Sequence, residues 1–257
     1  MEKIRFLYEN ELDSATVSAS SEETGFPAER TQHEWFLKHW RSTGDENEWL
    51  KWDCGAAVEV SHFLVRYHNL RQGSSFRIQA HASDDWGAPS LNSQVEVTAA
   101  MVSESVLFLD LSSDPKTYQW WRLFIDDASN PDGFFKIGRP FAGSHFEPSM
   151  NFSFARPWKP NDPSTILESG GGQIFAIEKA KYDAWEYSFE GLSTSDKGVF
   201  KDLWRDVGMT KTFFIIEDAD DVPETIYYVR NASPISIVPG SKIWDAWSVA
   251  MAVREER

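Results

Sequence analysis

The sequence YQWWRLFID at positions 118–126 decides the fold of the first half of the chain. In an extended chain Trp121, Leu123 and Ile125 lie on one face, and Trp, Arg and Phe occupy the positions between them. A period of two is typical of a β-strand that buries one face and exposes the other. We therefore predict a strand here, with Trp121, Leu123 and Ile125 in the core.

The residues after this strand predict a turn and a returning strand. Asn130-Pro131-Asp132-Gly133 combines residue types that favour tight turns, and residues 134–137 are largely apolar again. We expect a β-hairpin, and we expect its sheet to end near Phe141.

Shorter runs rich in β-branched and aromatic residues precede this hairpin. They are bounded by Gly, Asn, Asp, Ser and Pro, and their helical periodicity is weak. The runs are Val58–Tyr67 (VEVSHFLVRY), Phe76–Ala82 (FRIQAHA), Val95–Thr98 and Val106–Leu111. Spaced strands of this kind predict a β-sandwich.

The composition changes between Gly143 and Gln173. Four prolines and the run Gly170-Gly171-Gly172 interrupt any regular element longer than a few residues. A chain of 257 residues is long enough for two domains with separate cores. We therefore predict two domains, at residues 1–145 and 146–257.

The second domain is predicted to be mostly β with one helix. Trp185, Tyr187 and Phe189 alternate in one strand, and a long final strand is expected from Ile243 to Val253. A hairpin is expected around the acidic turn at residues 218–221.

The helix is predicted to begin after Ser193 and to end at Gly208. Ser193 is a good N-cap with Asp196 three residues later, and an apolar stripe follows at helical spacing. Gly208 is suited to end the helix. The apolar stripe predicts that the helix packs on a sheet.

The charge balance disfavours nucleic acid as a ligand. With 25 Lys and Arg against 40 Asp and Glu, the formal charge is −15, and no run of basic residues provides a local patch. The single cysteine, Cys54, cannot form an internal disulfide, which suits synthesis in a reducing cytoplasm. Neither a secretion signal nor a membrane anchor is expected from the apolar runs.

No sequence pattern predicts an enzyme. The pairs Asp84-Asp85, Asp126-Asp127 and Asp220-Asp221 lie in or beside predicted turns, where Asp is favoured for local hydrogen bonding. The six histidines lack metal-ligand spacing, and no phosphate loop or nucleophile motif occurs. We expect no catalytic residue, no cofactor and no metal site, although a calcium ion held by loop oxygens stays open as an alternative.

Aromatic residues in loop-like segments are the candidate ligand contacts. Trp35, Trp40 and Trp86 are candidates for glycan contact, because large rings can stack on the faces of sugars. Burial in the core is the competing interpretation for each of them.

The first half resembles discoidin-type, galactose-binding-like domains over most of residues 12–143. The matching motifs, in order, are Ala19-Ser20-Ser21, Phe26-Pro27-Ala28-Glu29, Trp40-Arg41-Ser42, Glu48–Gly55 (EWLKWDCG), Tyr67-His68-Asn69-Leu70 and Trp120-Trp121-Arg122. The resemblance implies a jelly-roll β-sandwich. The terminal cysteine pair of the extracellular members is missing, and the family has no common ligand motif to carry over, so no ligand is implied.

The second half resembles distal-tail and tail-tip proteins of long-tailed bacteriophages (siphophages). The resemblance lies in the order of elements over residues 146–257: FEPS at 146–149, the turn at 171–173, the strand at 185–189, the helix entry at 192–193 and the long final strand. In those proteins a tail-tube-like β-roll with one helix forms rings, so the resemblance implies a ring-forming assembly domain.

Together the two resemblances predict a virion structural protein, not an enzyme, made in the cytoplasm of the bacterial host. We expect a homo-oligomeric ring, six-fold rather than trimeric, at the distal end of the tail, with tail tube and hub proteins and host surface glycans as partners. Asp218, Asp220 and Asp221 are the candidate lumen-facing acidic turn. The alternative is a carbohydrate-binding module protein with an accessory second domain.

Overall fold

The computed structural model describes residues 2–154, 156–240 and 246–256, and the chain is mostly antiparallel β-structure, as the sequence predicts. The chain forms two compact units. We call residues 9–145 with 221–226 the sandwich unit, and the described parts of 2–8, 146–220 and 227–256 the helix unit. Each unit has its own core and is described separately.

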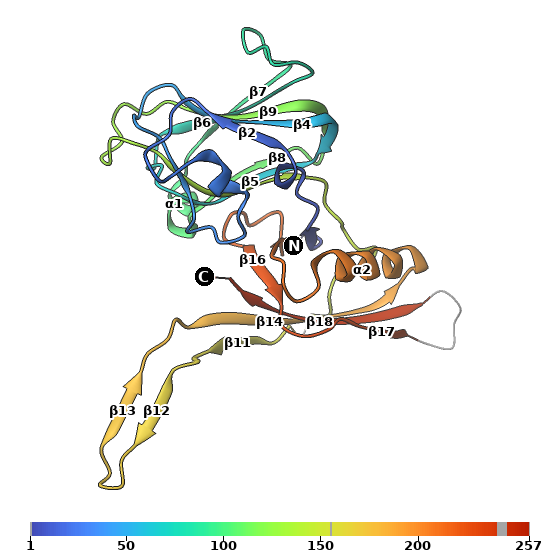
Figure 1. Ribbon diagram of the computed structural model, residues 1–257. Helices are drawn as coiled ribbons and strands as arrows, with labels where there is room; N and C mark the ends of the chain where they lie inside the picture. Colours follow the sequence, from blue (N-terminus) through green and yellow to red (C-terminus); the bar gives the residue numbers. More distant parts are fainter. Residues whose placement is uncertain (1, 155, 241–245, 257) are drawn as a thin grey trace. The chain divides into compact units, whose positions relative to one another are not determined.

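The first sheet of the sandwich unit has five antiparallel strands (Figure 1). In spatial order they are β2 (Thr16–Ala19), β4 (Glu48–Val60), β9 (Lys116–Ile125), β6 (Ser75–His81) and β7 (Leu91–Glu96). Trp121, Leu123 and Ile125 on β9 are buried, which confirms the alternation predicted from the sequence.

The second sheet of the sandwich unit has four antiparallel strands, and three short helical segments accompany the two sheets. The strands are β3 (Trp40–Arg41), β10 (Lys136–Gly143), β5 (His62–His68) and β8 (Val106–Asp110), in that order. The helical segments are η1 (Glu11–Asp13), η2 (Ala28–Gln32) and α1 (Ala99–Glu104). The two sheets pack on a shared apolar core, in which Trp52 of β4 meets Phe63 of β5 edge-on at 6.1 Å.

The predicted hairpin around Asn130–Gly133 is wrong. β9 pairs with β4 and β6, whereas β10 pairs with β3 and β5, so the turn carries the chain from one sheet to the other. The run Val58–Tyr67 likewise contains the end of β4 and most of β5, with a change of sheet at Ser61. Local sequence favours a turn equally well in both cases, and only sheet packing chooses the partner.

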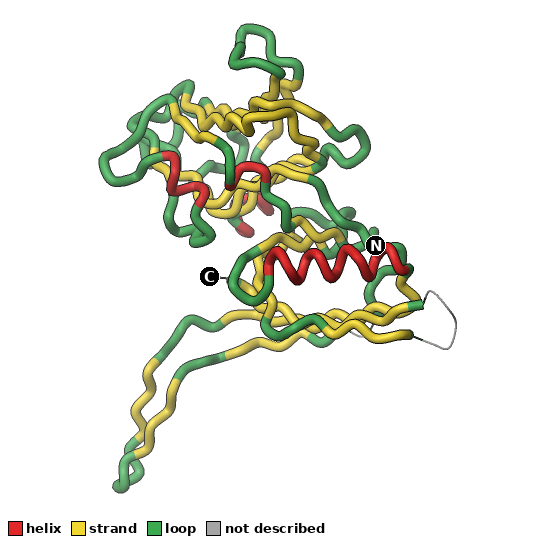
Figure 2. Tube along the Cα trace, turned by 45° about the vertical axis from the view of Figure 1, so that its right-hand side comes forward, coloured by secondary structure: helices red, strands yellow, loops and turns green. Residues whose placement is uncertain are grey.

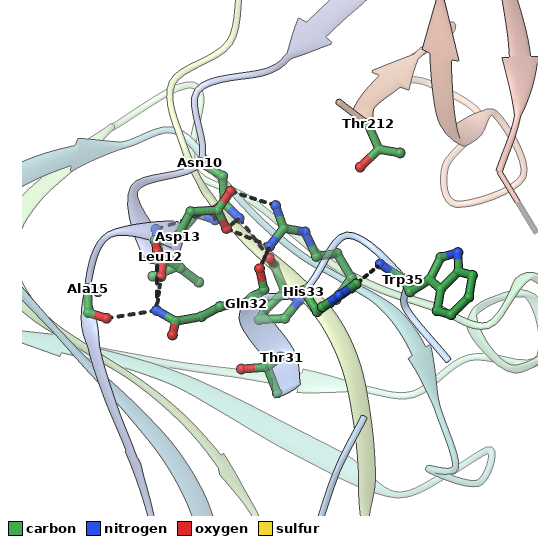
Figure 3. Close-up of polar contacts among 12 residues, drawn as sticks. Asn10, Leu12, Asp13, Ala15, Thr31, Gln32, His33, Trp35 and Thr212 are labelled. Carbon is green, nitrogen blue, oxygen red and sulfur yellow. Dashed lines mark hydrogen bonds and ion pairs between the residues drawn. The ribbon is translucent and has the colours of Figure 1, made fainter. Parts of the chain in front are cut away.

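Ion pairing fixes the first loop of the sandwich unit to β10 (Figure 3). The guanidinium of Arg139 binds both carboxylate oxygens of Asp13, at 2.5 and 2.7 Å, and donates to the carbonyl of Gln32. The Gln32 amide in turn donates to the carbonyls of Leu12 and Ala15, at 2.7 Å each. A bidentate pair with satisfied neighbours gives this loop a defined geometry.

The helix unit is built on a seven-stranded antiparallel sheet with the helix α2 (Thr194–Val207). The strand order is β1 (Arg5–Leu7), β15 (Phe213–Ile216), β16 (Ile226–Asn231), β18 (Trp247–Glu255), β14 (Tyr182–Leu192) and β11 (Trp158–Asn161), with β17 (Ser236–Pro239) also paired to β18. The described strand β18 covers part of the predicted final strand, whose positions 243–245 lie outside the described residues.

The first strand of the chain belongs to the helix unit, which differs from the predicted domain limits of 1–145 and 146–257. Phe6 is fully buried and packs edge-on against Phe200 of α2 at 5.6 Å. Its backbone exchanges two hydrogen bonds of 2.8 Å with Phe146, where the chain re-enters the unit. Residues 9–145, which make up most of the sandwich unit, are therefore inserted between two neighbouring segments of the helix unit.

The helix has the ends that the sequence predicts. Ser193 and Asp196 form a reciprocal capping box, and Gly208 closes the last turn on the carbonyl of Trp204. Phe200, Leu203 and Val207 are buried in the core of the unit with Tyr187 and other strand residues. The hydroxyl of Ser149 also hydrogen-bonds Asp196, which ties the start of the helix to the preceding loop.

An apolar hairpin extends from the helix unit. Strands β12 (Thr165–Glu168) and β13 (Ile174–Ile177) pair only with each other, and in Figures 1 and 2 they form an arm that continues from β11 and β14. Ile166 and Ile174 are about 70% exposed, and Leu167, Phe175 and Ile177 are more than half exposed. We call residues 165–177 the apolar arm.

Replacing Ser193 by Ala is expected to lower the free energy of unfolding of the helix unit by about 1 kcal/mol, because the cap of α2 loses its acceptor for the Asp196 N–H. The measurement is urea unfolding followed by the helical circular dichroism signal. Ser90, an exposed serine of the sandwich unit, is the matched control, and Ser90→Ala should change stability by less than about 0.5 kcal/mol. Equal effects of both substitutions would contradict the role of the cap.

Candidate functional site

The outward face of the five-stranded sheet carries an unusual set of side chains. Because alternate residues of a strand point to opposite faces, the strands that bury Trp52, Trp121 and Ile78 turn their other residues outward. This outward face combines rings and cations across three neighbouring strands. We call it the aromatic–cationic face.

Strand register arranges these side chains in three cross-strand rows. Each row joins residues that are direct partners in the antiparallel ladder, so their side chains lie side by side. The rows are Trp49–Phe124–Arg77–Gln94, Ser18–Lys51–Arg122–Gln79–Asn92 and Thr16–Asp53–Trp120–His81.

Cations and rings alternate on this face at contact distance. The ammonium of Lys51 lies 5.3 Å from the ring centre of Trp49 and 5.2 Å from that of Trp120. The guanidinium of Arg122 lies 4.2 Å from the ring centre of Trp86 and 5.6 Å from that of Phe124. Contacts of this kind hold the rings and the cations in fixed positions at the surface.

The loop between β6 and β7 folds Trp86 onto the face through Asp84. One carboxylate oxygen of Asp84 accepts from the Lys51 ammonium at 2.7 Å, and the other accepts from the Trp86 indole N–H at 2.6 Å. The hydrogen bond from Lys51 is the main cause that holds the pKa of Asp84 below its ordinary value. Asp84 is thus ionised at neutral pH and positions both a cation and a ring.

Arg122 stands at the centre of the face. Its Nε donates to the side-chain oxygen of Gln79 at 2.7 Å, and the Gln79 amide donates onward to Asn92 at 3.0 Å. Partial burial lowers the pKa of Arg122, and the charge of Asp84 opposes this shift. These polar contacts and the Trp86 ring, whose centre lies 4.2 Å from the guanidinium carbon, hold the residue in place.

The three tryptophans predicted as glycan contacts differ in position and in solvent exposure. Trp86 is part of the aromatic–cationic face. Trp35 is 58% exposed, but it lies in the loop after η2 with Lys38 and His33 as its neighbours (Figure 3). Trp40 has no exposed surface and donates its indole N–H to the carbonyl of Ser21, so its prediction as a glycan contact is wrong.

Most of the face was missed by the sequence interpretation. Trp49, Lys51, Arg77, Trp120 and Arg122 all occupy outward positions of strands. The signal that could have found them is the same alternation that predicts the core, since the second half of each alternating pattern is the exposed half. Rings and cations repeat in that half across three strands.

The acidic turn lies between β15 and β16, as predicted. Asp218 accepts a hydrogen bond from the backbone N–H of Glu2 at 2.8 Å and another from that of Asp220 at 3.2 Å. Asp220 and Asp221 are exposed. A position facing a lumen stays a prediction for this turn.

Two potential nucleophiles, the Ser61 hydroxyl and the Cys54 thiol, lie in environments that do not favour catalysis. Ser61 lies 2.8 Å from His62 and 3.0 Å from His145, but Ser61 and His62 are buried and a substrate could not reach the hydroxyl. Burial raises the pKa of Cys54 to about 12, which keeps it a thiol and a poor nucleophile. Over the described ranges, no group of three or more His, Cys, Asp or Glu residues is arranged to hold a metal ion.

The helix unit contains an ion pair between the buried Glu217 and the partly buried Arg156. Glu217 accepts from Arg156 Nε at 2.9 Å and from the hydroxyl of Tyr187 at 3.1 Å. Burial raises the pKa of Glu217, and the charge of Arg156 opposes this rise. One terminal nitrogen of Arg156, Nη1, is buried without a hydrogen-bond partner among the described residues. In the part of the chain that the structure describes, no helix is long and apolar enough to span a bilayer.

Comparison with known proteins gives likenesses of structure alone. No protein-family model matches the chain, and no curated protein matches it in sequence. Among solved structures, a chitosan-binding module of a chitosanase/glucanase from Paenibacillus sp. IK-5 is similar, with 18% identity and a TM-score of 0.43 over 53% of this chain and 99% of the module.

Two further solved structures are similar over the same share of the chain. A family 32 carbohydrate-binding module of NanJ from C. perfringens, in complex with galactose, has 16% identity and a TM-score of 0.42, covering 54% of this chain and 98% of that one. A fucose-binding module from Streptococcus pneumoniae has 12% identity and a TM-score of 0.42, covering 53% and 98%. The sandwich fold described above rests on its own strand order and register.

Protonation of Asp84 is expected to release the Trp86 indole. Because the folded-state pKa of Asp84 is lowered, the contact is present at neutral pH and is lost only as the pH falls below 3.8, the ordinary value. The measurement is the indole N–H signal of Trp86 in a nitrogen–proton correlation spectrum, assigned by its loss in Trp86→Phe.

The matched variants are two neighbouring aspartates. Asp84→Asn should move the Trp86 signal at neutral pH, whereas Asp85→Asn should leave it in place, since Asp85 accepts from the Gly87 N–H instead. A change that begins well above pH 3.8 in the unaltered protein would show that another group controls Trp86.

Proposed function

We propose that this chain is a non-enzymatic carbohydrate-binding protein whose sandwich unit binds glycans through the aromatic–cationic face. The observation that carries the proposal is the grouping of three partly exposed tryptophans, Trp49, Trp86 and Trp120, around the polar donors Lys51 and Arg122. The helix unit then serves as an accessory or assembly domain.

The chemistry of the face matches that of a sugar. A sugar ring has apolar C–H faces and polar hydroxyl edges, so it needs flat rings beside hydrogen-bonding groups. Trp49 and Trp120 lie on either side of Lys51, and polar side chains such as Gln79 and Asn92 continue the middle row. The rings are held by cations and by Asp84, so little side-chain freedom is lost on binding.

The apolar arm favours a second function, self-assembly. The register places Leu167 beside Phe175 on one face of the hairpin and Ile166 beside Ala176 on the other, so both faces carry apolar residues. A two-stranded hairpin has no core of its own, and exposed apolar area of this kind marks a protein contact. We propose that the arm packs on another copy of this chain.

The helix unit also has a surface that suits the arm. A shallow groove of about 460 Å³ lies along the outer side of β14 and β18, lined mainly by small residues that include Ser188, Ser236, Ala250 and Ala252. Small side chains let a neighbouring strand approach closely. An arm in the groove of the next subunit is a head-to-tail contact, which closes into a ring when the rotation permits.

A ring of this kind, together with the resemblance of the second half to distal-tail proteins, supports a role in a virion. In that form of the proposal the protein is a six-fold ring at the distal end of a long phage tail. It contacts tail tube and hub proteins, its acidic turn faces the lumen, and its sandwich units meet host glycans. The two functions are compatible, since each uses a different unit.

Glycan binding by the full chain is expected to depend on the aromatic–cationic face. Trp120→Ala should weaken binding on a glycan array about tenfold, because a stacking ring is lost, and Trp49→Ala should act similarly. Trp35→Ala is the matched control, an exposed tryptophan outside the face, and should bind as the unaltered protein does. Loss of binding in Trp35→Ala alone would move the site to the loop after η2.

Self-assembly is expected to depend on the apolar arm. The unaltered chain should form a ring in electron micrographs and a single large species in sedimentation. Phe175→Glu should reduce it to a monomer, because a charge would be buried in an apolar contact. Met209→Glu, an exposed apolar position just after α2, should keep the ring. A chain that is monomeric at high concentration without any substitution would contradict the proposal.

A further inference from the structure

We propose that the aromatic–cationic face selects acidic glycans, whose carboxylate or sulfate groups pair with Arg122 and Arg77 while their sugar rings stack on the tryptophans. This inference rests on the proposed glycan binding and adds the class of sugar.

Three cations follow one another across adjacent strands. Lys51 on β4 is the direct ladder partner of Arg122 on β9, and Arg77 on β6 is diagonal to Arg122, beside Phe124. Like charges that face each other directly across a ladder are unfavourable in themselves. Neighbouring strands lie about 4.8 Å apart, so the three charges form a short stripe that crosses the strands obliquely.

Among the described residues, one cation of the stripe forms an ion pair, although the charge of its partner Asp84 also acts on Arg122. Lys51 is paired with Asp84. Arg122 uses Nε for Gln79, and Arg77 uses Nε for Gln94 at 3.3 Å, both neutral acceptors. For the terminal nitrogens of both arginines, the described residues offer no acceptor within hydrogen-bonding distance. These two guanidinium ends therefore keep N–H pairs of the geometry that binds a carboxylate or sulfate at two points.

The stripe is positively charged, whereas the chain as a whole is strongly acidic. The formal net charge is −15, with 40 Asp and Glu residues, yet neither arginine forms an ion pair with a carboxylate of the described residues. Two arginines that hydrogen-bond only neutral side chains, beside flat rings, have charge complementarity to an acidic ligand.

Binding of a nucleic acid, which also offers acidic groups and flat rings, is less favoured than binding of an acidic glycan. A phosphate backbone carries a charge at every nucleotide and would be repelled by the acidic remainder of the chain. A glycan with charges on some of its sugars meets the stripe locally and leaves its neutral sugars for the rings. Single-stranded DNA is therefore kept as an alternative outcome of the test.

The test compares acidic and neutral glycans with the full chain. The probes are array glycans that bear uronate, sialate or sulfate groups, each beside its neutral counterpart, and a single-stranded thymidine oligonucleotide. The unaltered protein should prefer acidic members at least about tenfold, as expected when a charged hydrogen-bond pair is made. The preference should decline as salt is added.

Substitutions of the two arginines test whether the preference for acidic glycans depends on the stripe. Arg77→Gln should weaken binding of acidic members about tenfold and leave neutral members unchanged. Arg122→Gln should weaken binding of both classes, and of acidic members about tenfold more than of neutral ones, because Arg122 also contacts Trp86 within the face. Arg205→Gln is the matched control, because Arg205 is an exposed arginine of the helix unit and the change in charge is the same. Thermal unfolding of each variant checks that the sandwich is intact.

The possible failures are distinguishable. Equal binding of acidic and neutral members, lost in Trp120→Ala, overturns the acidic selectivity and leaves glycan binding standing. Binding to no glycan overturns both proposals. Binding of the oligonucleotide in preference to every glycan overturns the acidic-glycan inference in favour of nucleic acid.

Discussion

Antiparallel pairing of β4 with β9 is the constraint on which the sandwich unit depends. Trp52 and Trp121 are ladder partners, both fully buried, and they fix the register of the two central strands. A slip of either strand by one residue would turn its buried ring to solvent. The same register places Lys51 opposite Arg122 on the other face, so the core determines the geometry of the aromatic–cationic face.

The helix unit depends on contacts between distant parts of the chain. Phe6 joins the core of residues 185–253 and is held to Phe146 through the backbone. This arrangement lets the chain leave and re-enter the unit at one place, so a complete sandwich can be inserted without disturbing its core. Separate cores are also compatible with the separate functions proposed for the two units.

The sequence predicted features that depend on local spacing. Alternation at Trp121, Leu123 and Ile125 predicted a half-buried strand, and Ser193 with Asp196 predicted the start of α2, because caps and strand periodicity involve residues a few positions apart. It could not predict which strands pair. The strand after Gly133 enters the other sheet, and Arg5–Leu7 joins strands more than 200 residues later.

In the candidate site, too, local sequence patterns predicted some features and strand pairing set the others. Local sequence patterns predicted a mostly β chain, the capped helix α2 and aromatic candidates such as Trp86, but not the short helix α1, which Thr98 caps. The pairing of strands in the folded chain buries Trp40 and brings Trp49, Lys51, Trp120 and Arg122 onto one face. The physical reason is that burial and cross-strand neighbours are set by register between strands far apart in sequence, which local patterns do not encode.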